Sequence, residues 1–592
     1  MKEKFLQVFD LEKIILRLAA AWCISSEVLL GLSGVAFPDI SAYADMSIVS
    51  IGLMIIGIFG LLSVFATLLP EKADFYVLLP AFGCYTVVVM LCQRKLYFAF
   101  ALTAVWALLL WYYSKRGMLT AKHFGNRLTV TCIAVTAVCF TAFVSAVCIL
   151  RYLTFTSPNF DFTIFCQAYY YLKEELLPLS TCERDTLLSH FAVHASPVLY
   201  LLLPVYALFP YPCTLQVAQA VVLASAVIPV CLIAKKYDIK GPRLALIAVI
   251  TLFAPAVING ANYDFHENCF LYPLLCWVFL FLEKERYAHL AVFTLLTLGV
   301  KEDAAVYIIF LGLYVIFGKK KRLTGIALAL GAGIYFIAVL ALLSKYGQGV
   351  MSGRYANYIV GDGGLLEAIK TVLASPAYVF SQVFVDGDGN WANKLLYFIE
   401  MSLSLCFMPF MVKGKTPALI LLLPLLLVNL MTTYKYQFDI NFQYSFGSAA
   451  FLLYLSVLNL TDIERETGKF LLCTACVSCI MCTLGSAADK LNTYAVDYIE
   501  NRQAIALMDK AVKSVPEDSV VIASSKLTAH MCNRKSLYED VYHDNENGER
   551  ADYVLLDMRS GEVDMLDKYL ELGYEITSVV RSGDKRLIVI LQ

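Results

Sequence analysis

Charged residues are scarce in this chain. Only 16% of its 592 residues are Asp, Glu, Lys or Arg, whereas 59% are hydrophobic, and the formal net charge is −1. Because a soluble domain is usually about one quarter charged, so large an apolar surplus requires a lipid environment. A nearly neutral chain also lacks the basic excess that is typical of nucleic-acid binding. The composition therefore indicates an integral membrane protein that has the lipid bilayer as a partner and no nucleic acid.

The hydrophobic segments lack the alternation of apolar and polar residues that the strands of a lipid-facing β-barrel require. They are continuous runs of about 17 to 25 residues, which is long enough for a helix to cross a bilayer. The chain is therefore expected to be an all-α polytopic membrane protein. The predicted crossings lie at residues 18–36, 46–69, 75–92, 96–113, 127–150, 214–234, 244–260, 269–282, 287–300, 304–318, 323–343, 395–412, 416–432, 445–460 and 468–487.

Lys and Arg gather in a few short loops, and this predicts the orientation of the chain. Because such loops stay in the cytoplasm, the crossings alternate correctly only if the proline-containing run 196–210 lies at the membrane interface. The N-terminus is then cytoplasmic, loops 151–213 and 344–394 are external, and the expected location is the cell membrane. The basic loops are residues 114–127, 235–243, 319–322 and 413–415.

The chain is expected to have three regions. Residues 1–126 contribute additional transmembrane helices, and residues 127–487 form a transmembrane core. After Ala488 charges become more frequent and apolar runs shorten, so residues 488–592 are expected to form a small extracytoplasmic α/β domain. This last region has no glycine-rich phosphate loop and no HExxH motif, and its sequence assigns it no chemistry.

Four polar clusters lie at predicted helix ends, all on the external side. Ionisable groups at such positions are costly unless they are hydrated, paired or functional. We therefore expect the four clusters to meet in one site at the membrane surface. They are residues 159–161 (NFD), 189–194 (SHFAVH), 264–268 (DFHEN) and 301–303 (KED).

Asp161 is the candidate catalytic residue. It follows a predicted helix exit and precedes a predicted interfacial helix at 163–176. A carboxylate in this place can act as a general base toward an acceptor hydroxyl, or can orient it. The alternative is that Asp161 is only the N-cap of the next helix, a position that Asp favours.

Two histidines, His190 and His194, are candidate substrate-binding residues, and their spacing would place both on one helical face. Such a pair forms half of a metal site. Asp264, His266 and Glu267 would add ligands for a divalent metal ion, the one candidate cofactor, or groups for substrate binding and proton transfer. The alternatives are hydrogen-bonded interfacial histidines and an ordinary polar hairpin between two helices.

Basic side chains supply the candidate phosphate ligands. Lys301 can bind phosphate as a point charge, while Glu302 and Asp303 act on sugar hydroxyls or on a metal. The alternative for these three residues is a tight turn with an internal ion pair. Arg354, next to Tyr355 in the second long loop, can bind phosphate oxygens through two parallel hydrogen bonds.

Two further segments on the external side have simpler explanations. The glycine-rich run 361–364 is typical of a flexible loop. The aromatic run 434–444 (YKYQFDINFQY) is typical of an aromatic belt at the membrane interface.

These motifs resemble a family of polytopic membrane proteins known only as domain of unknown function 2079. The resemblance covers about residues 127–592, so that the first four crossings look like an addition to the family's core. It is carried by Asn159-Phe160-Asp161, His194-Ala195-Ser196-Pro197, Asp264-Phe265-His266, Lys301-Glu302-Asp303 and, more loosely, Val515-Pro516-Glu517-Asp518-Ser519.

That family is in turn similar to the GT-C glycosyltransferases, such as the protein mannosyltransferases and the lipid A aminoarabinose transferase. Those proteins have an essential acidic residue in the first external loop, followed by an H-P-P-L-like segment. Asp161 stands where that acid would be, and residues 194–197 (HASP) begin like H-P-P-L but depart from it in the middle. The resemblance implies transfer of a hexosyl or pentosyl group from a polyprenyl-phosphate carrier to a glycan, lipid or protein acceptor at the outer face.

A transporter or lipid flippase for an envelope precursor is the alternative function. Such a protein is expected to carry its polar groups near the bilayer midplane on broken helices, whereas the clusters here lie at predicted helix ends. A third possibility is an envelope protein without enzymatic activity whose C-terminal region binds a partner.

Overall fold

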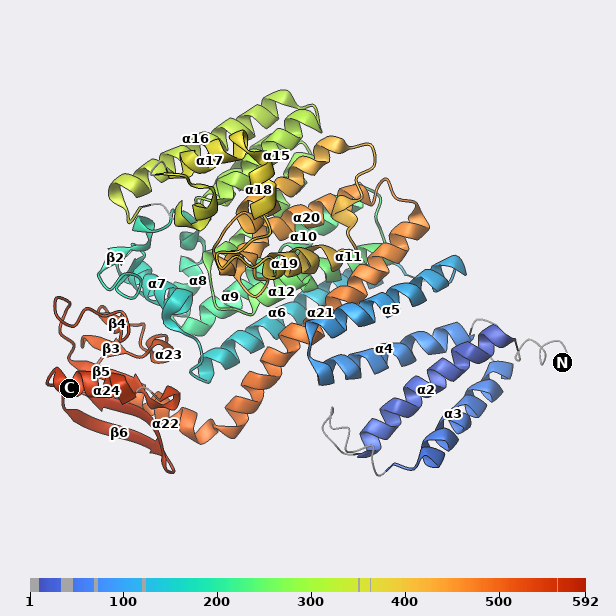
Figure 1. The fold of residues 1–592 in the computed structure, drawn as a ribbon, viewed down its shortest axis with the longest axis horizontal. Coiled ribbons are helices and arrows are strands. Elements are labelled where there is room, and N and C mark those ends of the chain that lie inside the picture. Colours follow the sequence, from blue (N-terminus) through green and yellow to red (C-terminus); the bar gives the residue numbers. More distant parts are fainter. Residues whose placement is uncertain are drawn as a thin grey trace. The chain divides into compact units, whose positions relative to one another are not determined.

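A computed structural model gives the fold of the chain (Figure 1). It describes residues 10–33, 46–68, 73–119, 124–349, 352–361, 364–561 and 563–592. These residues form two compact units, one from Met1–His123 with Glu464–Asp489 and the other from Phe124–Ile463 with Lys490–Gln592. The N-terminus, the end of the first predicted crossing and parts of the runs 114–127 and 361–364 lie outside the described residues.

The smaller unit is a bundle of apolar helices in which α2 packs against α3 and α4. An ion pair joins α2 to α4, because Arg17 Nε lies 2.9 Å from Asp74 Oδ1 and both side chains are buried. Since an unpaired charge among apolar helices is costly, the pairing explains how these two groups are accommodated. The helices are α2 (Leu11–Ser33), α3 (Ile48–Leu68), α4 (Ala73–Gln93), α5 (Leu96–Lys115) and the first part of α21 (Arg465–Glu500).

The larger unit contains most of the helices and the C-terminal sheet. A short hairpin in loop 151–213 pairs β1 (Leu179–Ser180) antiparallel with β2 (Leu188–Ser189). The helices before the C-terminal sheet are α6 (Asn126–Leu153), α7 (Ile164–Glu175), α8 (Leu203–Leu208), α9 (Pro212–Ala224), α10 (Val227–Lys236), α11 (Pro242–Phe253), α12 (Pro255–Ala261), α13 (Leu271–Glu283), α14 (Tyr287–Leu298), α15 (Ala304–Phe317), α16 (Arg322–Tyr346), α17 (Leu365–Ala374), α18 (Pro376–Gln382), α19 (Ala392–Leu403) and α20 (Phe446–Asn459).

Within the described residues, eight helices are long and apolar enough to cross a membrane, and the pair α11–α12, bent by 45°, adds a ninth if it counts as one crossing. The prediction of a multi-pass helical membrane protein is therefore confirmed. The eight are Leu11–Leu32, Ile48–Leu68, Ala73–Gln93, Leu96–Lys115, Asn126–Leu153, Pro212–Lys236, Arg322–Tyr346 and Arg465–Glu500.

Two of the predicted crossings, 395–412 and 416–432, are not continuous helices. After α19 the backbone passes through 3₁₀ and π turns, with Pro409, Pro417 and Pro424 among or just before them. Proline removes a backbone donor and clashes with the preceding turn, so it disturbs the regular α-helical hydrogen bonding although the composition stays apolar. Hydropathy alone predicted more full-length crossings than the described residues form.

The run 196–210, predicted to lie at the interface, is also broken. It consists of a 3₁₀ helix at Pro197–Leu201 and the six-residue α8. Pro204 at the start of α8 separates the two pieces. Neither piece is long enough to cross a bilayer.

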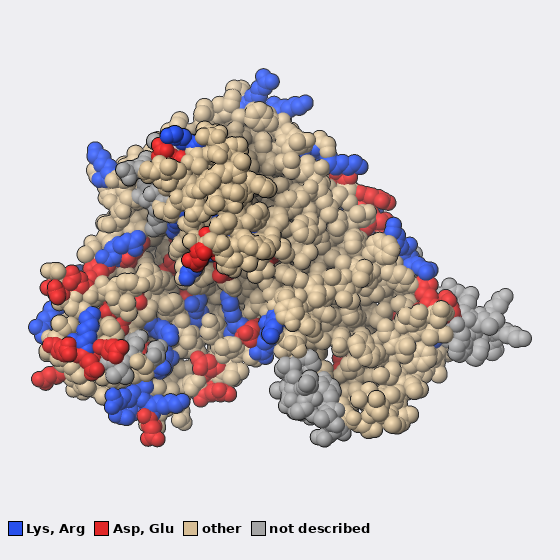
Figure 2. Space-filling view, viewed as in Figure 1, with Lys and Arg blue, Asp and Glu red and all other residues tan. Residues whose placement is uncertain are grey.

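The C-terminal domain, which begins with α22 (Arg502–Lys513), is an α/β domain, as predicted (Figure 1). Its five-stranded sheet has the order β4-β3-β5-β7-β6, in which β4, β3 and β5 are parallel and β7 is antiparallel to β5 and β6. Lys, Arg, Asp and Glu gather on this domain, while most of the helical surface on the face seen in Figure 2 is uncharged. Its elements are β3 (Val521–Ala523), α23 (Ser525–Thr528), β4 (Leu537–Glu539), β5 (Tyr553–Asp557), α24 (Val563–Glu571), β6 (Ile576–Ser582) and β7 (Lys585–Leu591).

A buried carboxylate at the C-terminal end of α13 ties four elements together. Glu283 Oε1 lies 2.5 Å from Lys319 Nζ, and Oε2 lies 3.1 Å from Lys236 Nζ. The hydroxyls of Tyr454 and Tyr237 donate to Oε1 and Oε2 at 2.5 and 2.7 Å. These contacts fix α13 at the end opposite to the polar residues that precede it.

Candidate functional site

A cavity of about 390 Å³ lies in the larger unit, and each of the four polar clusters contributes to its lining. The lining is rich in basic and aromatic side chains, with two carboxylates. The structure therefore brings together segments that are far apart in the sequence. The lining residues are Phe160, Asp161, Ile164, Phe165, Glu183, Arg184, His190, Val193, His194, His266, Lys301, Gly353, Arg354, Tyr434 and Tyr444.

Asp161 lies in a strained turn at this cavity. Its φ of +69° and ψ of −62° are rare for a residue with a side chain, and such a conformation costs about 1–3 kcal/mol. Its Oδ1 lies 3.9 Å from His266 Nε2, and its Oδ2 accepts a hydrogen bond of 3.3 Å from Gln443 Nε2. The N-cap of α7 is Thr163, so the alternative role of Asp161 as that cap is wrong.

Burial raises the pKa of Asp161, while the neighbouring His266 opposes the rise. The carboxylate is therefore a stronger base than an ordinary aspartate. Since a general base works best when its pKa is close to the operating pH, this shift favours proton transfer.

Glu267 is a fully buried carboxylate next to the cavity. Its Oε2 lies 2.8 Å from His266 Nδ1, and its Oε1 lies 3.7 Å from Lys301 Nζ and 4.0 Å from His190 Nε2. Burial opposes its ionisation, but His266 and Lys301 outweigh that effect and hold the pKa of Glu267 well below its usual range. Glu267 is therefore the negative group that His266, Lys301 and His190 share.

Each of the two histidines of the second cluster has its own carboxylate partner. His190 Nδ1 lies 3.1 Å from Glu183 Oε2, and His194 Nδ1 lies 2.9 Å from Glu302 Oε1. Burial lowers the pKa of His190, but Glu183 outweighs it and the net shift is upward. Burial and Lys301 lower the pKa of His194 to about 4, so its ring is neutral near pH 7. This matches the alternative of hydrogen-bonded histidines.

Asp264 does not line the cavity. Its Oδ2 pairs with Arg151 Nη1 at 3.1 Å, and its Oδ1 accepts from Gln216 Nε2 at 2.8 Å and from Ser157 Oγ at 3.1 Å. These contacts join the end of α6, the following loop and α9. Asp264 therefore supports the site from outside.

The possible divalent metal ion stays a prediction. Among the residues that the structure describes, no group of three or more His, Cys, Asp or Glu side chains is arranged to hold an ion. Of the three predicted ligands, His266 and Glu267 are adjacent, whereas Asp264 is engaged with Arg151.

The three charged residues of the fourth cluster point in different directions. Lys301 lines the cavity, with Nζ 5.9 Å from the ring centroid of Tyr444. Glu302 faces His194, and Asp303 is a partly buried residue at the start of α15. Lys301 pairs with Glu267. Within the described residues it forms no ion pair with Glu302 or Asp303, so the structure does not have the internal ion pair of the alternative.

The stability of the fold is expected to depend on the protonation of Asp303. Burial, together with Glu302, raises its pKa to about 6 from an ordinary 3.8, although Lys301 opposes the rise. The folded state therefore holds this proton more tightly, which stabilises the fold below about pH 4 and is lost as the pH rises through 6. We expect Asp303→Asn to be about 2 kcal/mol more stable than the wild type at pH 7.5 and equally stable at pH 4. Unfolding titrations at both pH values measure this, and equal stability at pH 7.5 would contradict it.

Arg354 and two tyrosines form the wall of the cavity near the loop 352–361. The Arg354 guanidinium carbon lies 4.5 Å from the ring centroid of Tyr434 and 5.5 Å from that of Tyr444. Tyr355 points elsewhere, because its hydroxyl donates to the Leu427 carbonyl at 3.1 Å and it does not line the cavity. Arg354 therefore lines the cavity, whereas Tyr355 does not.

Sequence reasoning missed several lining residues. Tyr434 and Tyr444 lie in the run assigned to an aromatic belt, and the mixture of aromatic and polar residues in that run is the signal that could have found them. Glu183 and Arg184 stand in an ordinary polar loop and gave no signal.

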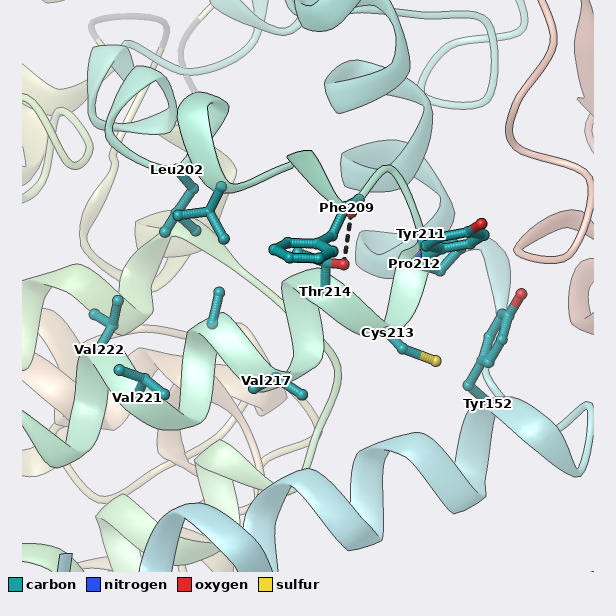
Figure 3. A pocket seen from close by; sticks show the side chains of 12 residues that line it. Tyr152, Leu202, Phe209, Tyr211, Pro212, Cys213, Thr214, Val217, Val221 and Val222 are labelled. Carbon is teal, nitrogen blue, oxygen red and sulfur yellow. Dashed lines mark hydrogen bonds between the residues drawn. The ribbon is translucent and has the colours of Figure 1, made fainter. Parts of the chain in front are cut away.

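A second cavity, of about 640 Å³, is lined almost entirely by apolar side chains from α8, α9 and the loop between them, with Tyr152 of α6 (Figure 3). The Thr214 hydroxyl, which would otherwise face it, donates to the Phe209 carbonyl at 2.6 Å. This surface suits a hydrocarbon chain and offers little to a polar ligand.

The chain belongs to the family described as predicted membrane protein DUF2079, whose pattern matches residues 151–578. No curated protein matches it. Among solved structures, it is similar to ArnT from Cupriavidus metallidurans bound to undecaprenyl phosphate, with 11% identity, a TM-score of 0.44 and coverage of 76% of this chain and 97% of that one. The apo structure of ArnT matches with the same identity and coverage and a TM-score of 0.39. The predicted membership of this family is therefore confirmed.

Proposed function

We propose that this membrane protein transfers a sugar from a polyprenyl-phosphate carrier to an acceptor hydroxyl at the outer face of the membrane. The observation that carries the proposal is the cavity in which a strained aspartate lies with three cationic side chains and two tyrosines. A lipid-linked sugar needs a phosphate site, a base near the sugar and a hydrophobic surface for the carrier. The two cavities offer these three features.

Lys301 and Arg354 are the proposed phosphate ligands. Lys301 lies 3.7 Å from Glu267, a distance longer than a hydrogen bond, and keeps donors for a ligand. Arg354 lies over the ring of Tyr434, and its Nη1 donates to Gln437 Oε1 at 3.5 Å. A guanidinium carries five N–H donors, so it can bind phosphate oxygens in addition to its protein partners. The apolar cavity of Figure 3 is the proposed surface for the carrier's hydrocarbon.

Asp161 is the proposed general base. Its carboxylate takes the proton of the acceptor hydroxyl while that oxygen forms a bond to the anomeric carbon. The bond between the anomeric carbon and the phosphate oxygen breaks, and the phosphate leaves with the electron pair. Lys301 and Arg354 stabilise the charge that develops on the phosphate. Attack on the face opposite the leaving group inverts the anomeric configuration.

The proposal places the cavity and the C-terminal domain outside the cell and the N-terminus in the cytoplasm, as the basic loops predict. The acceptor is a glycan, a lipid or a protein. A divalent ion remains part of the proposal, with His266 and Glu267 as nearest candidate ligands, and no step above depends on it.

Binding of undecaprenyl phosphate to the purified protein in nanodiscs tests the phosphate site. We expect Lys301→Met and Arg354→Met each to weaken binding about tenfold, since each removes a charge-assisted hydrogen bond worth roughly 1.5 kcal/mol or more. Lys435→Met is the matched control, because Lys435 is exposed in the neighbouring segment and does not line the cavity. Unchanged affinity in both variants would remove these residues from the phosphate site.

A further inference from the structure

The conformation of Asp161 depends on contacts outside its own turn. The backbone of the turn changes direction over two residues, from φ −58° and ψ 128° at Phe160 to φ +69° and ψ −62° at Asp161. A positive φ at a non-glycine residue persists only where the surrounding structure holds it. Groups elsewhere in the fold must therefore hold the residues before and after Asp161.

The C-terminal domain holds the residue two positions before Asp161. The backbone N–H of Asn159 donates to Ser525 Oγ at 3.0 Å, and its Nδ2 donates to Glu539 Oε2 at 2.6 Å. Asn159 is fully buried and Glu539 is nearly so. A short bond between a buried amide and a buried carboxylate fixes the start of the turn in both position and direction.

The same domain holds the residue two positions after Asp161. The hydroxyls of Thr163 and Thr528 lie 2.8 Å apart, and both residues are fully buried. The next residue, Ile164, belongs to the hydrophobic core of the C-terminal domain together with Phe155 on the other side of the turn. The turn is thus clamped on both sides by one domain.

These contacts come from one end of the strands of the sheet. Ser525 follows β3, Glu539 ends β4, and Arg559 follows β5 and donates to the carbonyl of Phe155 at 2.7 Å. Because β3, β4 and β5 are parallel, all three positions lie at the carboxyl end of the sheet. In open α/β sheets this end is where ligands usually bind. Here it receives the chain segment that carries Asp161.

We propose that the C-terminal domain is a positioning domain for the reaction, in which Ser525, Thr528 and Glu539 act through Asn159 and Thr163 to set the geometry of the Asp161 carboxylate. The inference rests on the proposed function of Asp161. None of the three residues lines the cavity, so they are positioning residues and not catalytic ones.

Transfer kinetics of the full-length protein test this role, with sugar-linked undecaprenyl phosphates as donors. Glu539→Ala is expected to lower kcat about tenfold to a hundredfold, since a small displacement of a reacting group has effects of this size. The KM for the donor is expected to change less than about twofold, because the phosphate ligands are untouched. Glu539→Gln keeps an oxygen that accepts from Asn159 and is expected to restore most of the rate. Thr528→Val, which tests the other side of the turn, is expected to lower kcat with the same unchanged KM.

Tyr538→Phe is the matched control. Tyr538 is the preceding residue of β4, and its hydroxyl donates to Glu549 within the C-terminal domain, so its loss is expected to leave transfer unchanged. Glu539→Ala and Thr528→Val must match this control in yield and unfolding midpoint, and if either does not fold, the other decides. Full transfer by the folded variants, while Asp161→Asn is inactive, overturns the positioning role alone. A wild type that transfers no sugar from any tested donor overturns the proposed function, and this inference with it.

Discussion

Asp161→Asn is expected to abolish sugar transfer while the protein remains folded. Asparagine has nearly the same shape as aspartate, and both residue types tolerate a positive φ, so the strained turn can persist. The amide cannot accept the proton of the acceptor hydroxyl. Because general-base catalysis is worth about 10²- to 10⁴-fold, we expect the rate to fall at least about a hundredfold. A transfer assay with lipid-linked sugars, together with size-exclusion chromatography of the variant, measures both parts of this prediction.

Asp439→Asn provides the control for that experiment. Asp439 is a carboxylate in the segment 434–444 that accepts hydrogen bonds from Asn441 but does not line the cavity. We expect this variant to retain the wild-type rate. The wild-type rate should also fall on acidification at a higher pH than an ordinary aspartate would give, because burial raises the pKa of Asp161. An Asp161→Asn protein with the wild-type rate would exclude this carboxylate from the mechanism.

Glu267→Gln is expected to destabilise the protein by about 3 kcal/mol or more, because it leaves the buried Lys301 without a compensating charge. His190 and His266 lose the same negative neighbour. Unfolding by titration with dodecyl sulfate in micelles measures the free-energy difference. The double variant Glu267→Gln with Lys301→Met is expected to recover a large part of the loss, since it removes both charges.

Glu302→Gln is the comparison for Glu267. Glu302 is 16% exposed, pairs with His194 and accepts a long hydrogen bond of 3.4 Å from the backbone N–H of Ala195. Because glutamine can still accept both hydrogen bonds, the substitution is expected to cost only roughly 1 kcal/mol. If both single variants lost equal stability, or if the double variant were no better than Glu267→Gln, the basic residues would not depend on Glu267 as the distances indicate.

The general architecture could be predicted from the sequence because it depends on local quantities. Apolar runs predict the membrane helices, and the rise in charge after Ala488 predicts the C-terminal domain. The regular α-helical geometry of several crossings could not be predicted from hydropathy, because 3₁₀ and π turns form near prolines such as Pro417 and Pro424 while the apolar character stays the same.

The site was predictable to the level of clusters but not of individual partners. The sequence predicts Asp161 as the catalytic residue and Asp264 as a substrate or metal ligand, yet only Asp161 lines the cavity. Asp264 instead pairs with Arg151, more than a hundred residues away in the chain. Tyr355 follows Arg354 directly, but the backbone is kinked at Tyr355 (φ −118°, ψ 26°), and its side chain contacts another neighbour. Pairings of this kind depend on packing, and no local pattern records them.

The Glu283 contacts have a consequence for the permanence of the membrane topology. Lys236 and Lys319, which bind this carboxylate, belong to two of the basic loops whose charges orient a nascent chain. During insertion these ammonium groups are hydrated and free, whereas in the finished protein they are fastened to the end of α13. Whichever side of the bilayer the loops occupy, moving one of them to the other side would break the contact between its lysine and the buried Glu283 carboxylate. Reversing the orientation would therefore cost the free energy of breaking these contacts with Glu283.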